Sequence, residues 1–201
     1  QSLDCSGNAL NNLDVILNTS LMNLSCSNNQ LNSLDLTQNI ALTNLECSFN
    51  NLNDLNLTAN TNLESLSCAS NELNNLELTN NSSLNMIDCG FNNLSSIDLS
   101  AQNVLTDLIC DNNQLTTLDM SSNNMLRQIN CGFNNLGSLD LSNQQDLEYL
   151  LCQSNQLTEL IAVFETPFPS WDGATVDCSY NELLELQVSG NNIKSLNCTH
   201  N

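Results

Sequence analysis

The chain has 201 residues and a formal net charge of −20, and its only lysine and arginine are Lys194 and Arg127. Nucleic acids and anionic membrane surfaces bind clustered basic residues, so this composition argues against both classes of partner. No apolar run approaches the ~20 residues of a membrane-spanning helix, and the high charge favours a soluble monomer at low salt. We therefore expect no membrane insertion and no nucleic-acid partner.

Ten cysteines set a period along the whole chain. The first seven gaps between them are 21 residues long and the last two are 26 and 20. An asparagine stands three residues after every cysteine. A fixed period of this length is typical of a solenoid, in which each repeat stacks on its neighbours. The cysteines are Cys5, Cys26, Cys47, Cys68, Cys89, Cys110, Cys131, Cys152, Cys178 and Cys198.

Each period follows the pattern L-x-x-L-x-C-x-x-N-x-L-x-x-L-x-L-x-x-N, as residues 42–60 show. Leu45 and Cys47 are two residues apart, as are Leu55 and Leu57, so each pair would face the same side of a strand. The segments between such pairs are too short for a helix, which usually needs about ten residues. The pattern predicts an all-β-dominated solenoid with two parallel sheets of short strands, one from each half of the repeat.

This motif resembles that of the leucine-rich repeat family. The 21-residue form, with one such unit in each half, resembles the short bacterial subclass called IRREKO repeats. The resemblance covers essentially all of residues 1–201 and implies one solenoid of about ten coils that serves as a binding scaffold. Similarity to surface-displayed bacterial repeat proteins also implies a secreted or cell-surface location.

The cysteines stand at inward strand positions where the family more often has leucine. We therefore expect a ladder of reduced, buried thiols. Disulfides are the alternative that a secreted, cysteine-rich chain suggests, and a metal site is disfavoured because no C-x-x-C pair occurs. The asparagines after the cysteines should bond to backbone groups of their own and adjacent coils.

Taken in chain order, residues 2–23 predict the first coil, and regular coils follow from Leu24 to Tyr149. The regularity breaks once, in an insertion at 161–176 that holds both prolines and the only tryptophan. Proline cannot donate to a β ladder, so this segment should leave the sheet. It predicts either a protein-binding loop anchored by Phe164, Phe168 and Trp171 or a loop that packs back on the solenoid. The array resumes and stops half-way through a repeat, so we expect a segment of a longer protein.

Aromatic residues occupy the position two after the cysteine in alternate coils. This aromatic row should advance by about 10 Å, twice the strand spacing. One interpretation is that the rings fold over the coil edge and cover leucines. The other is an exposed platform for a glycan or a protein partner. The row consists of Phe49, Phe91, Phe133 and Tyr180.

An acidic row occupies the outward position of the second strand. Neighbouring carboxylates about 4.8 Å apart would repel by only about 1 kcal/mol in water. The row is either a solvated acidic face or a set of Ca²⁺ sites between adjacent carboxylates, best at Asp98, Asp119 and Asp140. No other cofactor is expected. The acidic row comprises Asp14, Asp35, Glu77, Asp98, Asp119 and Asp140, with Asn56 at the equivalent position of one coil.

Catalytic chemistry finds little support in this chain. A single histidine, His200, rules out an internal Ser-His-Asp arrangement at a plausible place. A flat sheet of carboxylates also lacks the cleft that a glycosidase needs to separate two pKa values. The sequence predicts a non-enzymatic recognition module that binds a protein at the cell surface or outside the cell. The alternatives are a carbohydrate-binding or adhesion module that uses the aromatic row, with or without Ca²⁺, and a passive spacer.

Overall fold

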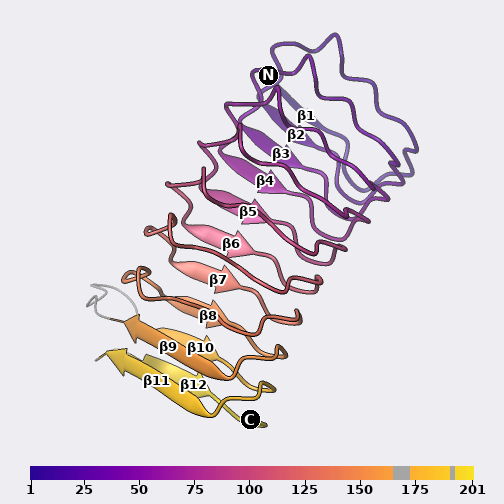
Figure 1. Ribbon diagram of the computed structural model, residues 1–201. Coiled ribbons are helices and arrows are strands. Elements are labelled where there is room, and N and C mark those ends of the chain that lie inside the picture. Colours follow the sequence, from indigo (N-terminus) through magenta and orange to yellow (C-terminus); the bar gives the residue numbers. More distant parts are fainter. Residues whose placement is uncertain (165–172, 191–192) are drawn as a thin grey trace.

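The computed structural model describes residues 1–164, 173–190 and 193–201. In these ranges every regular element is a β-strand, and the chain winds into a stack of coils (Figure 1). Ten strands form one parallel sheet, in which each strand pairs with the equivalent strand of the next coil. In order across the sheet they are β1 (Ser2–Asp4), β2 (Asn23–Ser25), β3 (Asn44–Glu46), β4 (Ser65–Ser67), β5 (Met86–Asp88), β6 (Asp107–Ile109), β7 (Gln128–Asn130), β8 (Tyr149–Leu151), β10 (Ala174–Asp177) and β12 (Ile193–Asn197).

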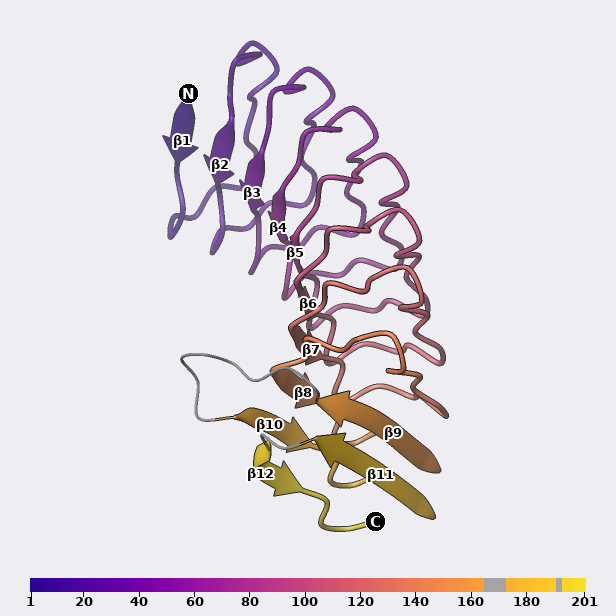
Figure 2. The same ribbon diagram turned by 90° about the vertical axis from the view of Figure 1, so that its left-hand side faces the viewer.

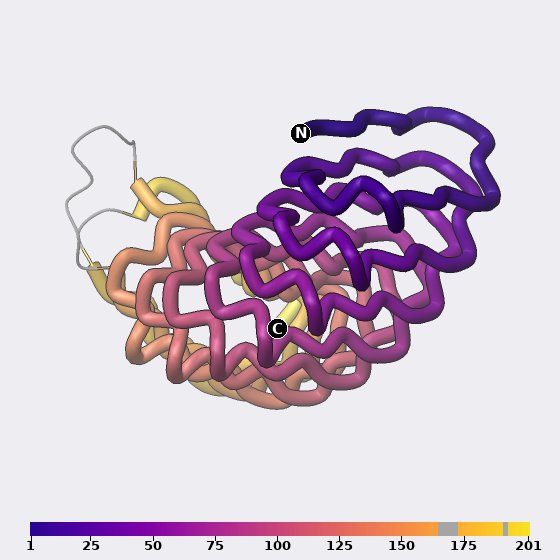
Figure 3. Tube along the Cα trace, turned by 90° about the horizontal axis from the view of Figure 1, so that it is seen from above, coloured from indigo at the N-terminus to yellow at the C-terminus, as the bar shows by residue number. Residues whose placement is uncertain are grey.

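The stack is curved, and the long sheet lines the inner side of the curve while the return segments lie on the outer side (Figure 2). Seen from above, successive coils are offset along the same curve (Figure 3). In β2–β8 the middle residue of each three-residue strand is buried and the outer two face the inner surface. The solenoid of short parallel strands that the repeat predicts is therefore confirmed.

The second sheet is regular in only one place among the described residues. It contains two strands, β9 (Glu159–Phe164) and β11 (Glu185–Gly190). In earlier coils the outward residue of this segment accepts a hydrogen bond from the backbone N–H two residues later, as Asp119 Oδ1 does from Ser121 at 2.9 Å. Such local bonds compete with a strand ladder. Ile161 holds the equivalent position in β9 and has no side-chain acceptor, so the ladder forms there.

Leucines and cysteines from every coil fill one continuous core. All ten cysteines are free thiols, and eight of them are fully buried. Burial raises the pKa of Cys26, Cys89 and Cys131 to about 12, so these thiols stay protonated. The expected ladder of reduced, buried thiols is present from Cys26 to Cys178, whereas Cys198 at the end of the array is exposed.

The asparagines after the cysteines join neighbouring coils. Asn50 Nδ2 donates to the carbonyl oxygens of Cys26 and Cys47 at 3.1 and 3.0 Å. Its Oδ1 accepts the Leu31 N–H at 3.0 Å. Because buried backbone groups need partners, this side chain satisfies groups on two adjacent coils at once. The predicted asparagine ladder is confirmed.

Candidate functional site

The inner sheet face changes character half-way along the stack. On β1–β4 every outward residue is polar or acidic, but β5, β6 and β8 carry four apolar side chains on the same face, and β7 between them presents Gln128 and Asn130. Tyr149 is 44% exposed, and the other three are half-buried. We call these four residues the inner apolar patch: Met86 on β5, Ile109 on β6, and Tyr149 and Leu151 on β8.

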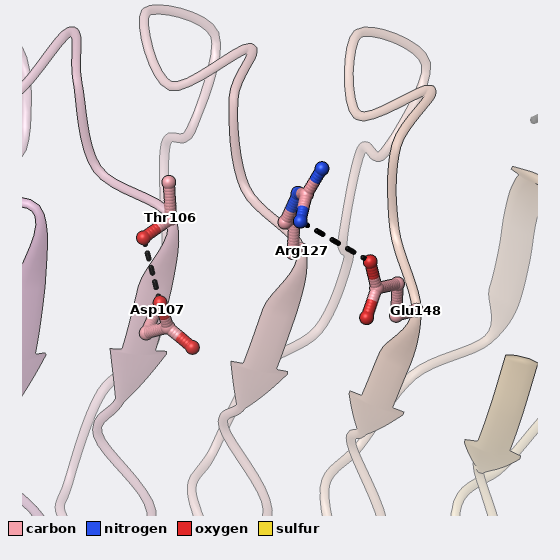
Figure 4. A network of polar contacts seen from close by, with 4 residues as sticks. All are labelled: Thr106, Asp107, Arg127 and Glu148. Carbon is pink, nitrogen blue, oxygen red and sulfur yellow. Dashed lines mark hydrogen bonds and ion pairs between the residues drawn. The ribbon is translucent and has the colours of Figure 1, made fainter. Parts of the chain in front are cut away.

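Charged groups lie at or just before the first residues of β6, β7 and β8 (Figure 4). Arg127 precedes β7 and its Nη1 lies 3.6 Å from Glu148 Oε1, while Thr106 Oγ1 donates to Asp107 Oδ2 at 2.6 Å. The Arg127 side chain is 57% exposed, and exposed ion pairs contribute only about 0–1 kcal/mol to stability. The pair therefore contributes little to the stability of the fold, and the Arg127 side chain stays accessible to solvent.

Two acids lie where the same strands end. Asp88 is the last residue of β5, and Asp111 follows β6 by two residues and is only 8% exposed. A Cβ added to Gly90 would come within 2.8 Å of Asp111 Oδ1, so the glycine makes room for this carboxylate. Burial and the charge of Asp111 raise the pKa of Asp88. A positive group brought by a partner would relieve this repulsion.

Phe164 corrects one prediction. It was expected to be a binding anchor in the insertion, but it is the last residue of β9 and is 1% exposed. Alternate residues of β9 face the core, and Leu160, Ala162 and Phe164 are the inward ones. Phe164 is therefore a core residue.

The predicted insertion at 161–176 is also shorter than expected. Residues 161–164 continue β9, and β10 begins at Ala174. A run of six residues that alternates inward and outward side chains extends the strand before the chain leaves it. Phe168 and Trp171 lie outside the described residues, so their role as anchors stays a prediction.

The aromatic row is exposed. Phe49, Phe91, Phe133 and Tyr180 are 57%, 56%, 49% and 55% exposed. Each ring is therefore about half covered and half in solvent, so both interpretations, rings that cover the coil edge and rings that form a platform, stay predictions. Their backbone is left-handed, with φ between 53° and 56°, which turns the side chains away from the core.

The acidic row keeps its carboxylates in solvent. Asp98, Asp119 and Asp140 each accept the N–H of the serine two residues later at 2.9 Å. Hydrogen bonds from that serine lower the pKa of all three carboxyls, with the hydroxyl as the larger cause at Asp98 and the N–H as the larger cause at Asp119 and Asp140. Across the part of the chain that the structure describes, no three His, Cys, Asp or Glu side chains gather as a metal site would require. Ca²⁺ binding between neighbouring carboxylates stays a prediction.

Comparison with known proteins adds to this picture. No protein-family model and no curated protein matches the chain. Among solved structures, the functional domain of InlJ from Listeria monocytogenes is 32% identical, with a TM-score of 0.83 over 94% of this chain and 43% of that one. YopM from Yersinia enterocolitica is 27% identical, with a TM-score of 0.67 over 100% of this chain and 47% of that one. A leucine-rich repeat protein of Leptospira interrogans shares the fold at 19% identity, with a TM-score of 0.71 over 93% of this chain and 55% of that one.

The repeat motif and the shared architecture agree. The chain is a leucine-rich repeat protein. It spans less than half the length of the InlJ and YopM chains that it resembles. The described ranges contain no helix that is long and apolar enough to cross a membrane.

The inner apolar patch was missed from the sequence of this leucine-rich repeat protein. Its signal is present in the printed repeats, because the residues on either side of the buried strand centre are Ser, Asn or acidic in the first four coils. Aligning the coils shows Met86, Ile109, Tyr149 and Leu151 as departures from that background. Only the strand assignment shows that all four share one face.

Proposed function

We propose that this leucine-rich repeat protein is a non-enzymatic recognition module that binds a protein partner on the inner face of β5–β8. The observation that carries the proposal is the inner apolar patch. Its four apolar residues lie on the same sheet face as the outward residues of β1–β4, all of which are polar or acidic. An exposed apolar surface rimmed by polar residues is typical of an interaction site.

The composition of the patch suits an interface. Tyr149 is an aromatic side chain with a polar tip, a residue type enriched among binding hot spots. Arg127 and Glu148 on one side and Asp88 and Asp111 on the other supply a charged rim, which gives specificity and orientation. The strands below are fixed by ladder hydrogen bonds and a packed core, so binding would need little rearrangement of the backbone.

We also propose that this encounter takes place outside the cell or at its surface. Similarity to the functional domain of InlJ from Listeria monocytogenes supports this part. So does the resemblance of the repeats to those of surface-displayed bacterial proteins.

A binding screen against extracellular protein and glycan arrays tests the proposal. The patch variant is Ile109→Ser/Leu151→Ser, which removes two apolar side chains and leaves the net charge unchanged. The matched control is Leu17→Ser/Leu184→Ser, because these leucines are 93% and 92% exposed and lie off the inner face. We expect a protein hit whose affinity falls about tenfold or more in the patch variant and is kept in the control.

Two other outcomes would contradict the proposal. Glycan hits alone, lost on Phe91→Ala and kept in the patch variant, would support the carbohydrate-binding alternative. No binding on any array would support the alternative that the chain is a passive spacer.

A further inference from the structure

The aromatic row stands on an unusual backbone position. Two residues after every cysteine the chain is left-handed, with φ of 67° at Gly7 and between 52° and 60° at the other nine positions. Glycine adopts this conformation without strain, and a bulky side chain does so at a cost. Four coils nevertheless carry an aromatic ring there that is about half exposed. Because Ser70, Asn112 and Ser154 share this conformation, the fold of the turn sets it, whichever side chain stands there.

The end of the array shows how rings at this position meet. Tyr180 and His200 occupy it in adjacent coils, and their rings stack with centroids 4.3 Å apart and planes 5° from parallel. Elsewhere the aromatic residues are two coils apart. Their rings are then separated by roughly 10 Å, twice the strand spacing. A planar group stacked midway between two such rings would lie about 5 Å from each, close to the 4.3 Å between centroids in the Tyr180–His200 pair.

Short side chains form the floor of two of these gaps. Ser70 lies between Phe49 and Phe91, and Ser154 lies between Phe133 and Tyr180; both serines are half-buried. We call these gaps the Ser70 slot and the Ser154 slot.

The third gap is occupied by the chain itself. Asn112 lies between Phe91 and Phe133, and its Nδ2 donates to Asp111 Oδ2 at 2.6 Å. This bond holds the amide against Asp111, in the coil between those of the two rings. The chain therefore presents two open slots, one on each side of an occupied one.

Charge decides which planar group suits the slots. The chain carries a net charge of −20. Glu72 stands two residues after Ser70, Glu182 stands two residues after Tyr180, and both glutamates are exposed. An arginine guanidinium is planar, always positively charged, weakly hydrated and prone to stack on aromatic faces. A lysine ammonium has the same charge but no planar face. A neutral sugar ring could donate hydroxyl hydrogen bonds to the surrounding acids but would form no ion pair with them.

We propose that the Ser70 and Ser154 slots each take the guanidinium group of an arginine from a basic protein partner. This inference rests on the proposed function, because it names the chemistry of the protein that the module binds. The rings supply stacking on both faces of the guanidinium, and the nearby glutamates supply the opposite charge.

Hexaarginine and hexalysine peptides are the probes, titrated by fluorescence anisotropy at about 0.15 M salt, where long-range attraction is screened. Hexaarginine should bind several-fold more tightly than hexalysine. Phe91→Ala keeps the net charge and should weaken hexaarginine binding about two- to fivefold, the range of an exposed cation–π contact, while hexalysine binding stays unchanged.

Filling the slots gives a second test that removes no ring. Ser70→His/Ser154→His reproduces the Tyr180–His200 arrangement inside each slot, and at about pH 8 the added imidazoles are neutral. This variant should lose the preference for hexaarginine while its thermal unfolding temperature stays close to that of the parent chain. Ser33→His/Ser138→His, which places the same residue away from the row, is the control and should keep the preference.

Equal binding of the two peptides by the parent chain would overturn the inference, and so would a preference that survives both Phe91→Ala and the filled slots. Binding of neutral cellohexaose that is lost in Phe91→Ala, with no arginine preference, would assign the row to glycans instead. The patch variant Ile109→Ser/Leu151→Ser should bind hexaarginine like the parent chain. Failure of the slots is therefore distinguishable from failure of the inner apolar patch.

Discussion

Replacing Asn92 with alanine should lower the free energy of unfolding by about 2–4 kcal/mol. The Asn92 side chain is buried, and its Nδ2 donates to the carbonyl oxygens of Cys68 and Cys89, each at 3.1 Å. Its Oδ1 accepts the buried N–H of Leu73, in the preceding coil, at 3.0 Å. One side chain therefore ties two coils together.

The magnitude follows from which groups would lose their last partner. The Cys68 carbonyl keeps a bond from Asn71, and the Cys89 carbonyl keeps one from Asn113. The Leu73 N–H would have no acceptor left. A buried donor without a partner costs about 1–3 kcal/mol, and the lost hydrogen bonds add about 1 kcal/mol more.

Urea unfolding followed by circular dichroism measures this change, and Asn93→Ala is the matched control. Asn93 is exposed and adjacent in sequence, so its replacement should change stability by no more than about 0.5 kcal/mol. The comparison requires that the slope of the unfolding free energy against urea concentration be the same in both variants and the parent chain. A changed slope would mean that the coils no longer unfold together. Equal effects of the two substitutions, or a loss below about 1 kcal/mol in Asn92→Ala, would refute the reasoning.

Three further predictions concern titratable groups. Burial raises the pKa of Cys89 to about 12 from an ordinary 9.0, so this thiol ionises at a lower pH in the unfolded chain than in the folded one. The free energy of unfolding should therefore fall as the pH rises above 9.0. Urea midpoints measured at increasing pH check this prediction, and a midpoint that does not change with pH would contradict it. A thiol reagent at neutral pH should label exposed Cys198 readily, leave Cys47 unreacted until denaturation and then count all ten thiols, and a smaller final count would indicate disulfides. Asp111→Asn should lower the raised pKa of Asp88, measured by nuclear magnetic resonance titration of the carboxyl carbon, because it removes the neighbouring charge; an unchanged pKa would mean that desolvation alone sets it. The last prediction concerns Ca²⁺ binding, measured by calorimetry at millimolar metal. A binding heat that vanishes in Asp119→Asn would support the predicted site, and no heat in the parent chain would refute it.

The regular part of the fold could be predicted because the repeat is local. A 21-residue period with paired apolar positions admits few structures other than a stack of coils, and each coil buries its leucines only against its neighbours. The asparagine ladder and the buried thiols follow from the same argument. The second sheet was less predictable, because side chains such as Asp119 capture a backbone N–H that a ladder would need.

The candidate site was harder to predict. Phe164 stands in a segment rich in turn and aromatic residues, which suggested an exposed loop, yet strand pairing of β9 with β11 carries it into the core. The aromatic row could be listed from the sequence, but its exposure depends on a left-handed backbone that sequence spacing does not reveal. The inner apolar patch emerged only when residues of three separate coils were placed on one face.

The sequence alone therefore determined the solenoid, its period, its core and its acidic character, because these depend on composition and on contacts between repeats one period apart. Tertiary structure decided which side chains reach solvent together: Met86, Ile109, Tyr149 and Leu151 on one face, and the aromatic row along the turns. The physical reason is that burial follows from a local pattern. A binding surface is made by residues from several coils whose outward directions are set by strand pairing and backbone conformation.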